Sequence, residues 1–362
     1  MKLLFEFPRF HTNNAGMVNA LIDDGHEVVF SVVRQSDIED HSQIKPVRQM
    51  QSLASKALCH LFKQNDAVLP LYFPNIRSHF RFLRNCQPDI AIIRSPYRVI
   101  CIFTLIYCLI YRKKVLFYSQ YLVIRKNNLP KWLFRYFLSV LCNANWMCPL
   151  YFQTFDFQKH IPFLVEDNSR KNNRIRENIS EGLRLLVVAK SMPRKNIILV
   201  IKTLKALLER GFKGSLTIVT EVSTNAHRQH YEEIIACLDE LGIEKYVEIL
   251  RNVEYREMPK IYRACDIFIF PAFNEVASVS LLEAMAHGCV AITSDQNGTA
   301  TYINHGNNGF VFDPNDMESL VCIIESLTEQ KKYEYIYKNS TFSSTTMTSR
   351  KVFLKNFYDA IQ

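Results

Sequence analysis

The chain has 362 residues, of which 48% are hydrophobic and 22% are charged. This excludes a disordered chain and leaves room for two globular domains. The ten cysteines form no CxxC pairs and have no partnered histidines, so neither a zinc site nor a disulfide framework is expected. In the opening residues, MKLLFEFPRF, the apolar run before Arg9 is too short for a signal peptide. A cytoplasmic location is therefore expected.

Positive charge is concentrated in the first half of the chain. Residues 1–180 hold 24 Lys and Arg against 13 Asp and Glu, whereas the remaining residues hold 20 against 22. A basic half can face anionic lipid, a phosphorylated substrate or nucleic acid, or it can be a solvated surface without a partner. Because the sequence has no zinc finger, RNA-binding signature or base-reading basic helix, no nucleic-acid partner is expected.

The chain begins with a predicted βαβ unit. Apolar runs at residues 2–7 and 28–33 predict strands. Helical spacing of apolar residues predicts a helix over residues 17–24, which ends at Gly25. Residues 40–85 give no clear pattern. Further strands are predicted at residues 90–93, 115–118 and 146–148.

The first strand and helix are joined by the loop FHTNNAG, residues 10–16. The first amides of the helix are unpaired and its dipole favours anions, so the loop is a candidate phosphate site. It lacks GxGxxG, and a simple turn capped by Thr12 or Asn13 explains the local pattern equally well.

Two apolar segments lie in the basic half. Residues 99–111, VICIFTLIYCLIY, are uncharged but number only 13, and a bilayer crossing takes roughly 20. The segment is either a helix buried against the sheet or one that partly enters a membrane surface beside Arg112, Lys113 and Lys114. Residues 130–141, PKWLFRYFLSVL, also mix aromatic and basic side chains and add weight to the second interpretation.

The second half of the chain follows a polar, charged segment at residues 166–182, which predicts a linker between domains. Strands and helices then alternate, which predicts a parallel sheet with helices on both faces. The predicted strands are residues 185–189, 215–220, 247–250, 267–270 and 290–293. The predicted helices are residues 197–209, 231–241, 258–264 and 280–286, and a last helix near residues 350–361 follows a Ser/Thr-rich segment.

Glu275 and Glu283 are the first candidate site residues. Glu275 follows a predicted strand, and Glu283 lies along the next helix with seven residues between the two. Ligands of open α/β sheets bind at the carboxyl ends of strands, so two acids at this place predict a site.

Arg194 and Lys195 stand in another strand–helix loop, VAKSMPRKN. Two cations beside a helix N-terminus suit a diphosphate, because the charges and the amides attract the same ligand. Taken alone, the segment favours a solvated basic loop. Its place at a strand end, in the same domain as Glu275 and Glu283, shifts the balance towards a site.

Residues 185–313 resemble the nucleotide-sugar domain of the retaining glycosyltransferases of family four. Glu275 and Glu283 match the Glu-x7-Glu motif of that family. The surrounding segments IYRACDIFIFPAFNE, LLEAMAHGCVAI and INHGNNGFVF match as well. LLVVAKSMPRKN is similar to the basic strand–loop of the family, and GHEV after the first helix resembles the start of its acceptor domain.

The resemblance implies an α/β protein of the GT-B fold, with two Rossmann-like domains whose parallel sheets face across a cleft. The acceptor-binding domain is then expected at residues 1–165, the linker at 166–182 and the nucleotide-sugar domain at 183–340. Residues 341–362 are expected to form a C-terminal helix that packs back on the N-terminal domain.

The resemblance also implies roles for single residues. Arg194 and Lys195 would hold the donor diphosphate and stabilise the charge that develops as it leaves. Glu283 would bind the ribose, and Glu275 would lie against the donor sugar as the third catalytic residue. Further donor contacts are expected from Gly16, Asn274, Ala277, Ser278 and Val279, and acceptor contacts from His11, Tyr118 and Gln120.

Departures from the family pattern keep a second hypothesis open. Val276, Ala277 and Ser278 stand where the family usually has glycines, FYSQY (residues 117–121) lacks a histidine, and Thr301 replaces a frequent acid. These changes fit an unusual acceptor or reduced activity. The alternative is a catalytically silent GT-B protein that binds a nucleotide sugar or scaffolds polysaccharide assembly enzymes.

The expected function is a retaining hexosyltransferase. It would move a sugar from a nucleoside-diphosphate sugar to a hydroxyl of a glycan or lipid-linked glycan, in surface polysaccharide or lipopolysaccharide biosynthesis. No cofactor or metal is expected. The basic, aromatic-rich half suggests peripheral contact with an anionic membrane at the inner face of the cell membrane.

Overall fold

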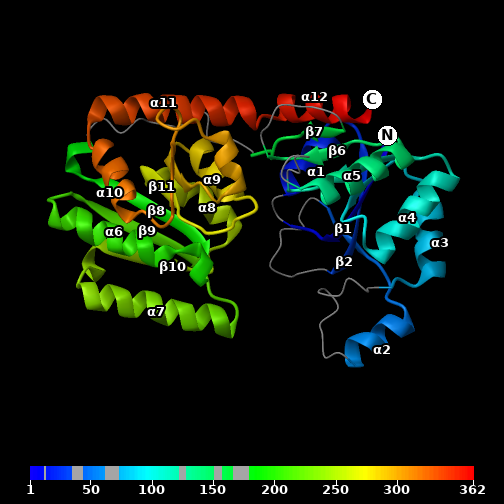
Figure 1. Cartoon of the computed structure of the whole chain (residues 1–362), viewed down its shortest axis with the longest axis horizontal. Coiled ribbons are helices and arrows are strands. Elements are labelled where there is room, and N and C mark those ends of the chain that lie inside the picture. Colours follow the sequence, from blue (N-terminus) through cyan, green and yellow to red (C-terminus); the bar gives the residue numbers. More distant parts are fainter. Residues whose placement is uncertain (12–13, 35–43, 62–72, 122–127, 151–156, 166–178) are drawn as a thin grey trace. The chain divides into compact units, whose positions relative to one another are not determined.

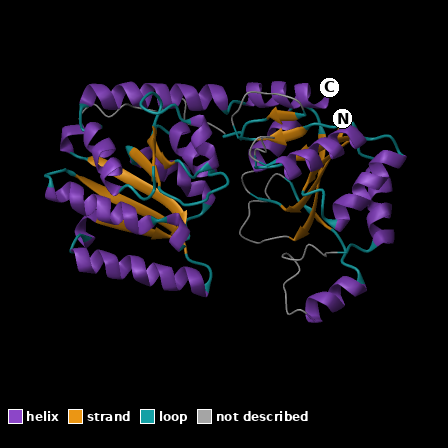
Figure 2. Ribbon diagram, viewed as in Figure 1, coloured by secondary structure: helices purple, strands orange, loops and turns teal. Residues whose placement is uncertain are grey.

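A computed structural model describes residues 1–11, 14–34, 44–61, 73–121, 128–150, 157–165 and 179–362. The chain divides into two compact units (Figure 1). The N-terminal unit comprises Met1–Leu164 and Arg350–Gln362, and the C-terminal unit comprises Val165–Ser349. In each unit helices pack around a sheet of strands (Figure 2).

The N-terminal unit contains a seven-stranded sheet in the order β3-β2-β1-β4-β5-β6-β7, with parallel neighbours throughout. Its strands are β1 (Lys2–Arg9), β2 (Glu27–Arg34), β3 (Val47–Arg48), β4 (Ile90–Arg94), β5 (Lys114–Tyr118), β6 (Trp146–Cys148) and β7 (Gln158–His160). Its helices are α1 (Ala15–Asp23), α2 (Leu53–Leu61), α3 (Ile76–Cys86), α4 (Val99–Ile110), α5 (Leu129–Cys142) and α12 (Arg350–Ile361).

This sheet has a hydrophobic core on each face. Successive strand residues point to opposite faces, so Leu3 and Phe5 pack with residues of α1 and α12, whereas Leu4 packs with residues of α3, α4 and α5. In α12, Phe353 and Phe357 are fully buried. Burying such a side chain stabilises a fold by about 1.5–3 kcal/mol, which anchors the C-terminal helix on this unit.

The C-terminal unit contains a six-stranded parallel sheet in the order β10-β9-β8-β11-β12-β13. Its strands are β8 (Leu183–Lys190), β9 (Gly214–Glu221), β10 (Val247–Arg251), β11 (Ile267–Phe270), β12 (Val290–Ser294) and β13 (Phe310–Phe312). Its helices are α6 (Ile197–Glu209), α7 (Asn225–Leu241), α8 (Met258–Ala264), α9 (Val279–Ala286), α10 (Met317–Ser326) and α11 (Gln330–Met347).

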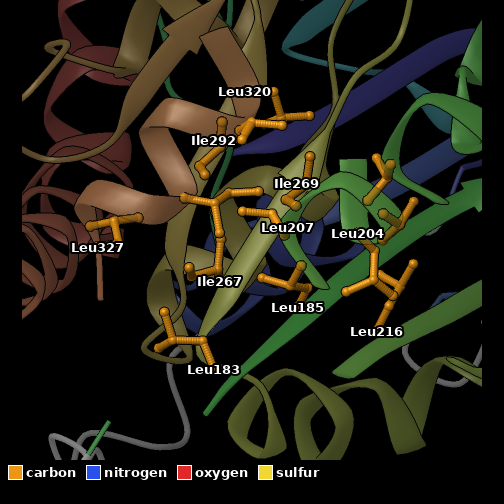
Figure 3. Packing of buried hydrophobic residues seen from close by; sticks show 14 of the residues in the cluster. Leu183, Leu185, Leu204, Leu207, Leu216, Ile267, Ile269, Ile292, Leu320 and Leu327 are labelled. Atoms are coloured by element: carbon orange, nitrogen blue, oxygen red, sulfur yellow. The ribbon is translucent and has the colours of Figure 1, made fainter. Parts of the chain in front are cut away.

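One large apolar cluster forms the core of the C-terminal unit. Leu185, Leu216 and Ile269 extend from neighbouring strands towards Leu204 and Leu207 of α6 (Figure 3). The strands are apolar along most of their length because helices cover both faces of a parallel sheet.

Most predicted elements form where the sequence pattern placed them, and the α/β class with two parallel sheets is correct. The chain end differs from the expected boundaries. The Ser/Thr-rich residues 341–347 complete α11 in the C-terminal unit, and only the residues from Arg350 onwards join the N-terminal unit. Residues 166–178 of the expected linker lie outside the described residues, and Ile179–Glu181 forms a 3-10 turn.

None of the helices in the described part of the chain combines the length and the apolar character needed to span a membrane.

Candidate functional site

The candidate residues of the C-terminal unit lie on two loops that follow neighbouring strands. β8 leads into the 3-10 turn Pro193–Lys195 and then α6, and β11 leads through residues 271–278 into α9. The chain passes from β8 to β9 and β10 on one side, and then returns to β11 on the other side. The carboxyl ends of β8 and β11 therefore flank the point where the strand order reverses, which is where ligands bind in such sheets.

Arg194, Lys195 and Glu275 meet in one ion cluster. Arg194 Nη1 lies 2.5 Å and Lys195 Nζ lies 2.6 Å from the same oxygen, Glu275 Oε2. Lys195 is buried, with Nζ 4.9 Å from the ring centre of Phe270. Burial lowers the pKa of Lys195, and its hydrogen bond to Glu275 offsets part of that effect. The structure thus brings together the three residues expected to be catalytic.

Backbone hydrogen bonds fix the loop that carries Glu275. The Glu275 amide donates to Gln296 O at 3.0 Å, and its carbonyl accepts from Gly298 N at 2.9 Å. The Phe273 amide donates to Arg194 O at 2.8 Å, which joins the two loops directly. Asn274 has a φ of 47°, a left-handed conformation that asparagine tolerates better than most residues. The acid is therefore held from both sides by backbone.

Glu283 is held by two tyrosines that the sequence pattern did not indicate. Tyr255 donates to Glu283 Oε1 at 2.8 Å, and Tyr262 donates to Oε2 at 2.9 Å. Burial raises the pKa of the Glu283 carboxyl, and the two hydrogen bonds work in the opposite direction. Each carboxylate oxygen retains acceptor capacity, because a carboxylate offers about four lone-pair sites.

The segment between the two acids ends in the first turn of α9. Ser278 is buried, its amide donates to Thr299 Oγ1 at 3.2 Å, and its Oγ lies 2.8 Å from Ser280 Oγ. The Ser278 amide therefore has a protein partner. Ala277 and Val279 are half-buried and Asn274 is exposed, and the first amides of a helix have no partner within the helix itself.

The candidate residues of the N-terminal unit lie at the carboxyl ends of β1 and β5. The ring of His11 lies 3.0–3.2 Å from the guanidinium of Arg9. Tyr118 is buried, its ring centre lies 5.2 Å from that of Phe7, and burial raises its pKa to about 12. Gln120 Oε1 accepts from Arg94 Nη2 at 2.9 Å. Tyr118 and Gln120 line a cavity of about 710 Å³.

Gly16 lies in the first turn of α1, close to the backbone of Leu164. A Cβ at this position would lie 2.8 Å from Leu164 O and 3.1 Å from its Cδ2. The close approach of Leu164 therefore explains a glycine at position 16 without any contact to a donor. Thr12 and Asn13, the alternative caps of this helix, lie outside the described residues.

Within the described residues, no group of three or more His, Cys, Asp or Glu side chains is arranged to hold a metal ion.

The C-terminal half of the chain matches a known family. The family model described as "Glycosyl transferases group 1" matches residues 168–341. The chain is 23% identical over 164 residues to the amylovoran biosynthesis glycosyltransferase AmsK of Erwinia amylovora, which covers 44% of this chain and 39% of the relative. Other curated relatives also align over less than two fifths of their own length.

Solved structures are similar over almost the whole chain. A glycosyltransferase from Rickettsia africae matches with a TM-score of 0.76 at 14% identity, covering 99% of this chain and 97% of that chain. The Anabaena protein Alr3699/HepE in complex with UDP-glucose matches with a TM-score of 0.70 at 14% identity, covering 99% of each chain.

Two parallel-sheet α/β units and this structural similarity define a protein of the GT-B fold. Residues 168–341 match the glycosyl transferases group 1 family. The expected fold is therefore confirmed, and the family match supports a glycosyltransferase.

Proposed function

We propose that the protein is a retaining glycosyltransferase that uses a nucleoside-diphosphate sugar. The ion cluster of Arg194, Lys195 and Glu275 carries the proposal, because it lies at the strand-order reversal of the unit that matches the family. A carboxylate and two cations at such a point suit a ligand that joins a diphosphate to a sugar.

The diphosphate is proposed to bind Arg194 and Lys195. A guanidinium carries five N–H donors and an ammonium three, and Glu275 Oε2 engages one nitrogen of each side chain. Donors therefore remain for phosphate oxygens. The N-terminus of α9 adds the amide of Val279, its first residue, that of Ala277 just before the helix, and the positive end of a helix dipole.

The proposed transfer breaks the bond between the anomeric carbon and the diphosphate oxygen. A new bond forms from the acceptor oxygen to the same face of that carbon, and the acceptor proton passes to the departing diphosphate. Arg194 and Lys195 stabilise the negative charge that develops on the diphosphate. Glu275 faces the sugar and supports its positive charge, Glu283 binds the ribose hydroxyls, and the step needs no metal.

The proposed acceptor is a glycan or lipid-linked glycan of surface polysaccharide or lipopolysaccharide assembly. The amylovoran biosynthesis glycosyltransferase among its relatives supports this assignment. The site of action is proposed to be the cytoplasmic face of the cell membrane, with acceptor contacts from the cavity that Tyr118 and Gln120 line.

Membrane contact is proposed for the α4–α5 face, a set of exposed apolar side chains. These are Ile102, Ile106, Leu109 and Ile110 on α4 and Leu133, Phe134, Tyr136, Phe137, Val140 and Leu141 on α5. Residues of both helices, among them Leu109 and Val140, line one cavity with Arg112, Lys113 and Lys114, so apolar and basic side chains adjoin. That combination suits the surface of an anionic membrane.

The test is a panel of nucleoside-diphosphate sugars incubated with the purified chain, with release of nucleoside diphosphate measured by mass spectrometry. Release from at least one donor is expected. Lys195→Ala should weaken binding of the free nucleoside diphosphate about tenfold, because hydrogen bonds to charged groups contribute about 1.5–3 kcal/mol. Lys202→Ala, an exposed lysine of α6, is the matched control and should bind normally.

The same panel tests the second candidate, a catalytically silent nucleotide-sugar binder or scaffold. Val276, Ala277 and Ser278 motivate it, because side chains at positions where the family usually has glycines would narrow the space for a donor sugar. Binding of a donor without transfer or slow hydrolysis would establish that candidate and reject the enzyme. Unchanged affinity in Lys195→Ala would reject the assigned role of this lysine.

A further inference from the structure

A second candidate site lies in the N-terminal unit, at the carboxyl ends of β4 and β5 and beside the first residue of β6. Arg94, Ser119 and Trp146 belong to these strands or directly follow them, and they line the cavity of about 710 Å³. The opposite wall comes from the start of α5, including Asn128 and Lys131. Strand ends and a helix N-terminus thus meet at one cavity, an arrangement that favours anions.

The charged side chains of this cavity are all cations. Arg94, Lys131 and Arg135 line it, and no Asp or Glu is found among its described lining residues. The sequence reinforces this bias, since residues 90–155 contain nine Lys and Arg but no Asp or Glu. The cavity is therefore electropositive, and a neutral glycan alone would not use its charge.

Arg135 is a buried cation held by neutral partners. It donates from Nη2 to Ser119 Oγ at 2.6 Å, and from Nη1 to Tyr121 O at 2.9 Å and Gln158 Oε1 at 3.1 Å. Its guanidinium carbon lies 4.5 Å from the ring centre of Trp146. These partners fix the guanidinium in place without neutralising it, and burial lowers its pKa to about 10. A buried cation that no carboxylate of the described residues pairs with is costly, and an anionic ligand would offset that cost.

Arg94 is positioned in a similar way. Its guanidinium carbon lies 5.9 Å from the ring centre of Phe7 and 5.7 Å from that of Tyr118, and Nη2 donates to Gln120 Oε1. A guanidinium fixed by ring stacking and one amide keeps donors for a further acceptor.

The rim of the cavity is aromatic and continues into the α4–α5 face. Tyr97, Tyr121 and Phe134 line the cavity and are 64%, 60% and 44% exposed. Phe134 also belongs to the α4–α5 face defined above. A ligand that binds the cations with an anionic group therefore meets apolar surface on leaving the cavity.

We propose that this cavity binds the phosphate or diphosphate of the acceptor through Arg94, Lys131 and Arg135. The acceptor class is thus a phosphate-linked one, a polyprenyl-type lipid phosphate or a soluble sugar phosphate. The inference rests on the proposed transferase function in identifying the ligand as an acceptor. The binding of an anion in this cavity can be tested without the donor site.

The experiment measures ligand binding through tryptophan fluorescence. The chain has two tryptophans, Trp132 and Trp146, both in the N-terminal unit, and Trp146 lines the cavity. Farnesyl diphosphate is titrated against the full chain, with farnesol as its uncharged counterpart. The expected result is a fluorescence change with farnesyl diphosphate and at least tenfold weaker binding of farnesol. Equal binding of both compounds, or no binding of the diphosphate, would overturn the proposal.

Variants assign the effect to the cations. Arg94→Gln and Lys131→Gln should each weaken farnesyl diphosphate binding about tenfold, and Arg81→Gln, an exposed arginine of α3, should leave it unchanged. Lys131 is exposed, so its replacement tests the site even if Arg94→Gln fails to fold. Unchanged affinity in both variants would refute the site.

Two further arms separate the possible ligands and the two sites. Tighter binding of farnesyl diphosphate than of inorganic pyrophosphate and a hexose 1-phosphate would support a lipid phosphate. Equal binding of the three would support a soluble sugar phosphate. The titration is also run in Lys195→Ala, because the proposed donor site takes a diphosphate as well. Both tryptophans lie in the N-terminal unit, so a fluorescence change that weakens in Arg94→Gln and Lys131→Gln but not in Lys195→Ala assigns the binding to this cavity. If no sugar transfer is found, the binding of farnesyl diphosphate to this cavity can therefore still be confirmed or refuted.

Discussion

Glu275 accepts from Arg194 and Lys195 through a single oxygen. Because two cations face one carboxylate, this ion cluster has one positive charge in excess. Charge-assisted hydrogen bonds are roughly twice as strong as neutral ones, and the excess charge favours a phosphate over a neutral sugar at this point. Glu283 has a different environment, because its partners are two neutral tyrosines. A carboxylate with neutral donors around it suits the hydroxyl groups of a ribose.

Replacing Glu283 with Gln separates ribose binding by Glu283 from phosphate binding by Arg194 and Lys195. A carboxylate accepts hydrogen bonds at both oxygens, whereas an amide accepts at one only. Glu283→Gln should therefore weaken binding of a nucleoside diphosphate about tenfold, equivalent to about 1.4 kcal/mol, and leave inorganic pyrophosphate binding unchanged. Calorimetric titration measures both, with Glu240→Gln on α7 as the exposed control. Equal weakening of both ligands would mean that Glu283 acts only on the structure.

The sequence carried enough information for one part of this site and not for the other. Arg194, Lys195 and Glu275 follow strands that are visible as apolar runs, so their meeting could be predicted from the rule that parallel strand ends share an edge. Tyr255 and Tyr262 lie around α8 and reach Glu283 only through the tertiary fold. No local pattern marks a tyrosine as the partner of a distant acid.

At the scale of elements, α4 and α5 each bury one side and expose the other. On α4, Ile100 and Leu105 are buried while Ile106 and Ile110 are exposed. The helix does pack against the sheet, as the first interpretation expected, while entry into a membrane surface stays a prediction for its exposed apolar side. Periodicity could not separate them, because a helix that is apolar all round has no visible buried stripe.

The charges beside this face should control membrane binding. Exchanging Arg112, Lys113 and Lys114 together for Gln should weaken binding to vesicles of phosphatidylcholine and phosphatidylglycerol about 100-fold, since each cation near an anionic surface contributes about 1 kcal/mol. Vesicle co-sedimentation at fixed salt measures the change. A triple exchange of Lys202, Lys213 and Lys260 in the C-terminal unit alters net charge equally and should have little effect. Absence of vesicle binding by the unchanged chain would refute membrane contact.

Elements that the sequence did not predict owe their form to packing. In α11, Tyr333, Tyr337, Ser340 and Ser344 are buried on one side, so the helical period is present but is carried by polar and aromatic residues. β7 is another example, since Gln158–His160 has no apolar alternation and is a strand because it pairs with β6. Tertiary contacts override weak local propensity in both. Strongly apolar elements such as Ile197–Glu209 were predicted to the residue.

At the scale of the whole molecule, a buried polar network joins the first sheet to two of its helices. Glu6 of β1 is fully buried and accepts from Ser31 Oγ of β2 at 3.0 Å and from Thr104 Oγ1 of α4 at 3.4 Å. His79 of α3 reaches the same Thr104 Oγ1 at 2.9 Å through Nε2, and its Nδ1 lies 3.0 Å from Gln49 Oε1. Burial raises the pKa of Glu6 to about 8 and lowers that of His79 to about 4.

These shifts fix how Glu6 affects stability as pH changes. The carboxyl has an ordinary pKa of 4.5 and a folded pKa of about 8. Between these values the folded chain retains a proton that the unfolded chain releases, so its contribution to the free energy of unfolding falls as pH rises. The contribution is full below about pH 4.5 and lost above about pH 8. His79 acts in a different window, because its lowered pKa reduces stability as pH falls from 6.5 towards 4.

Glu6→Gln should remove the loss of stability that Glu6 causes as pH rises from about 4.5 to about 8. The amide keeps the size of the side chain, can accept from Ser31 and can donate to Thr104, but it does not titrate. We expect the melting temperature of the variant to fall less than that of the unchanged chain between pH 5 and pH 8, with the largest gain at pH 8. A gain of a few kcal/mol at pH 8 is the scale that a pKa shift of this size implies.

Differential scanning calorimetry across the pH series measures this gain, with Glu27→Gln on the same sheet, an exposed acid, as control. Parallel curves for Glu6→Gln and the unchanged chain would show that Glu6 is ionised in the fold.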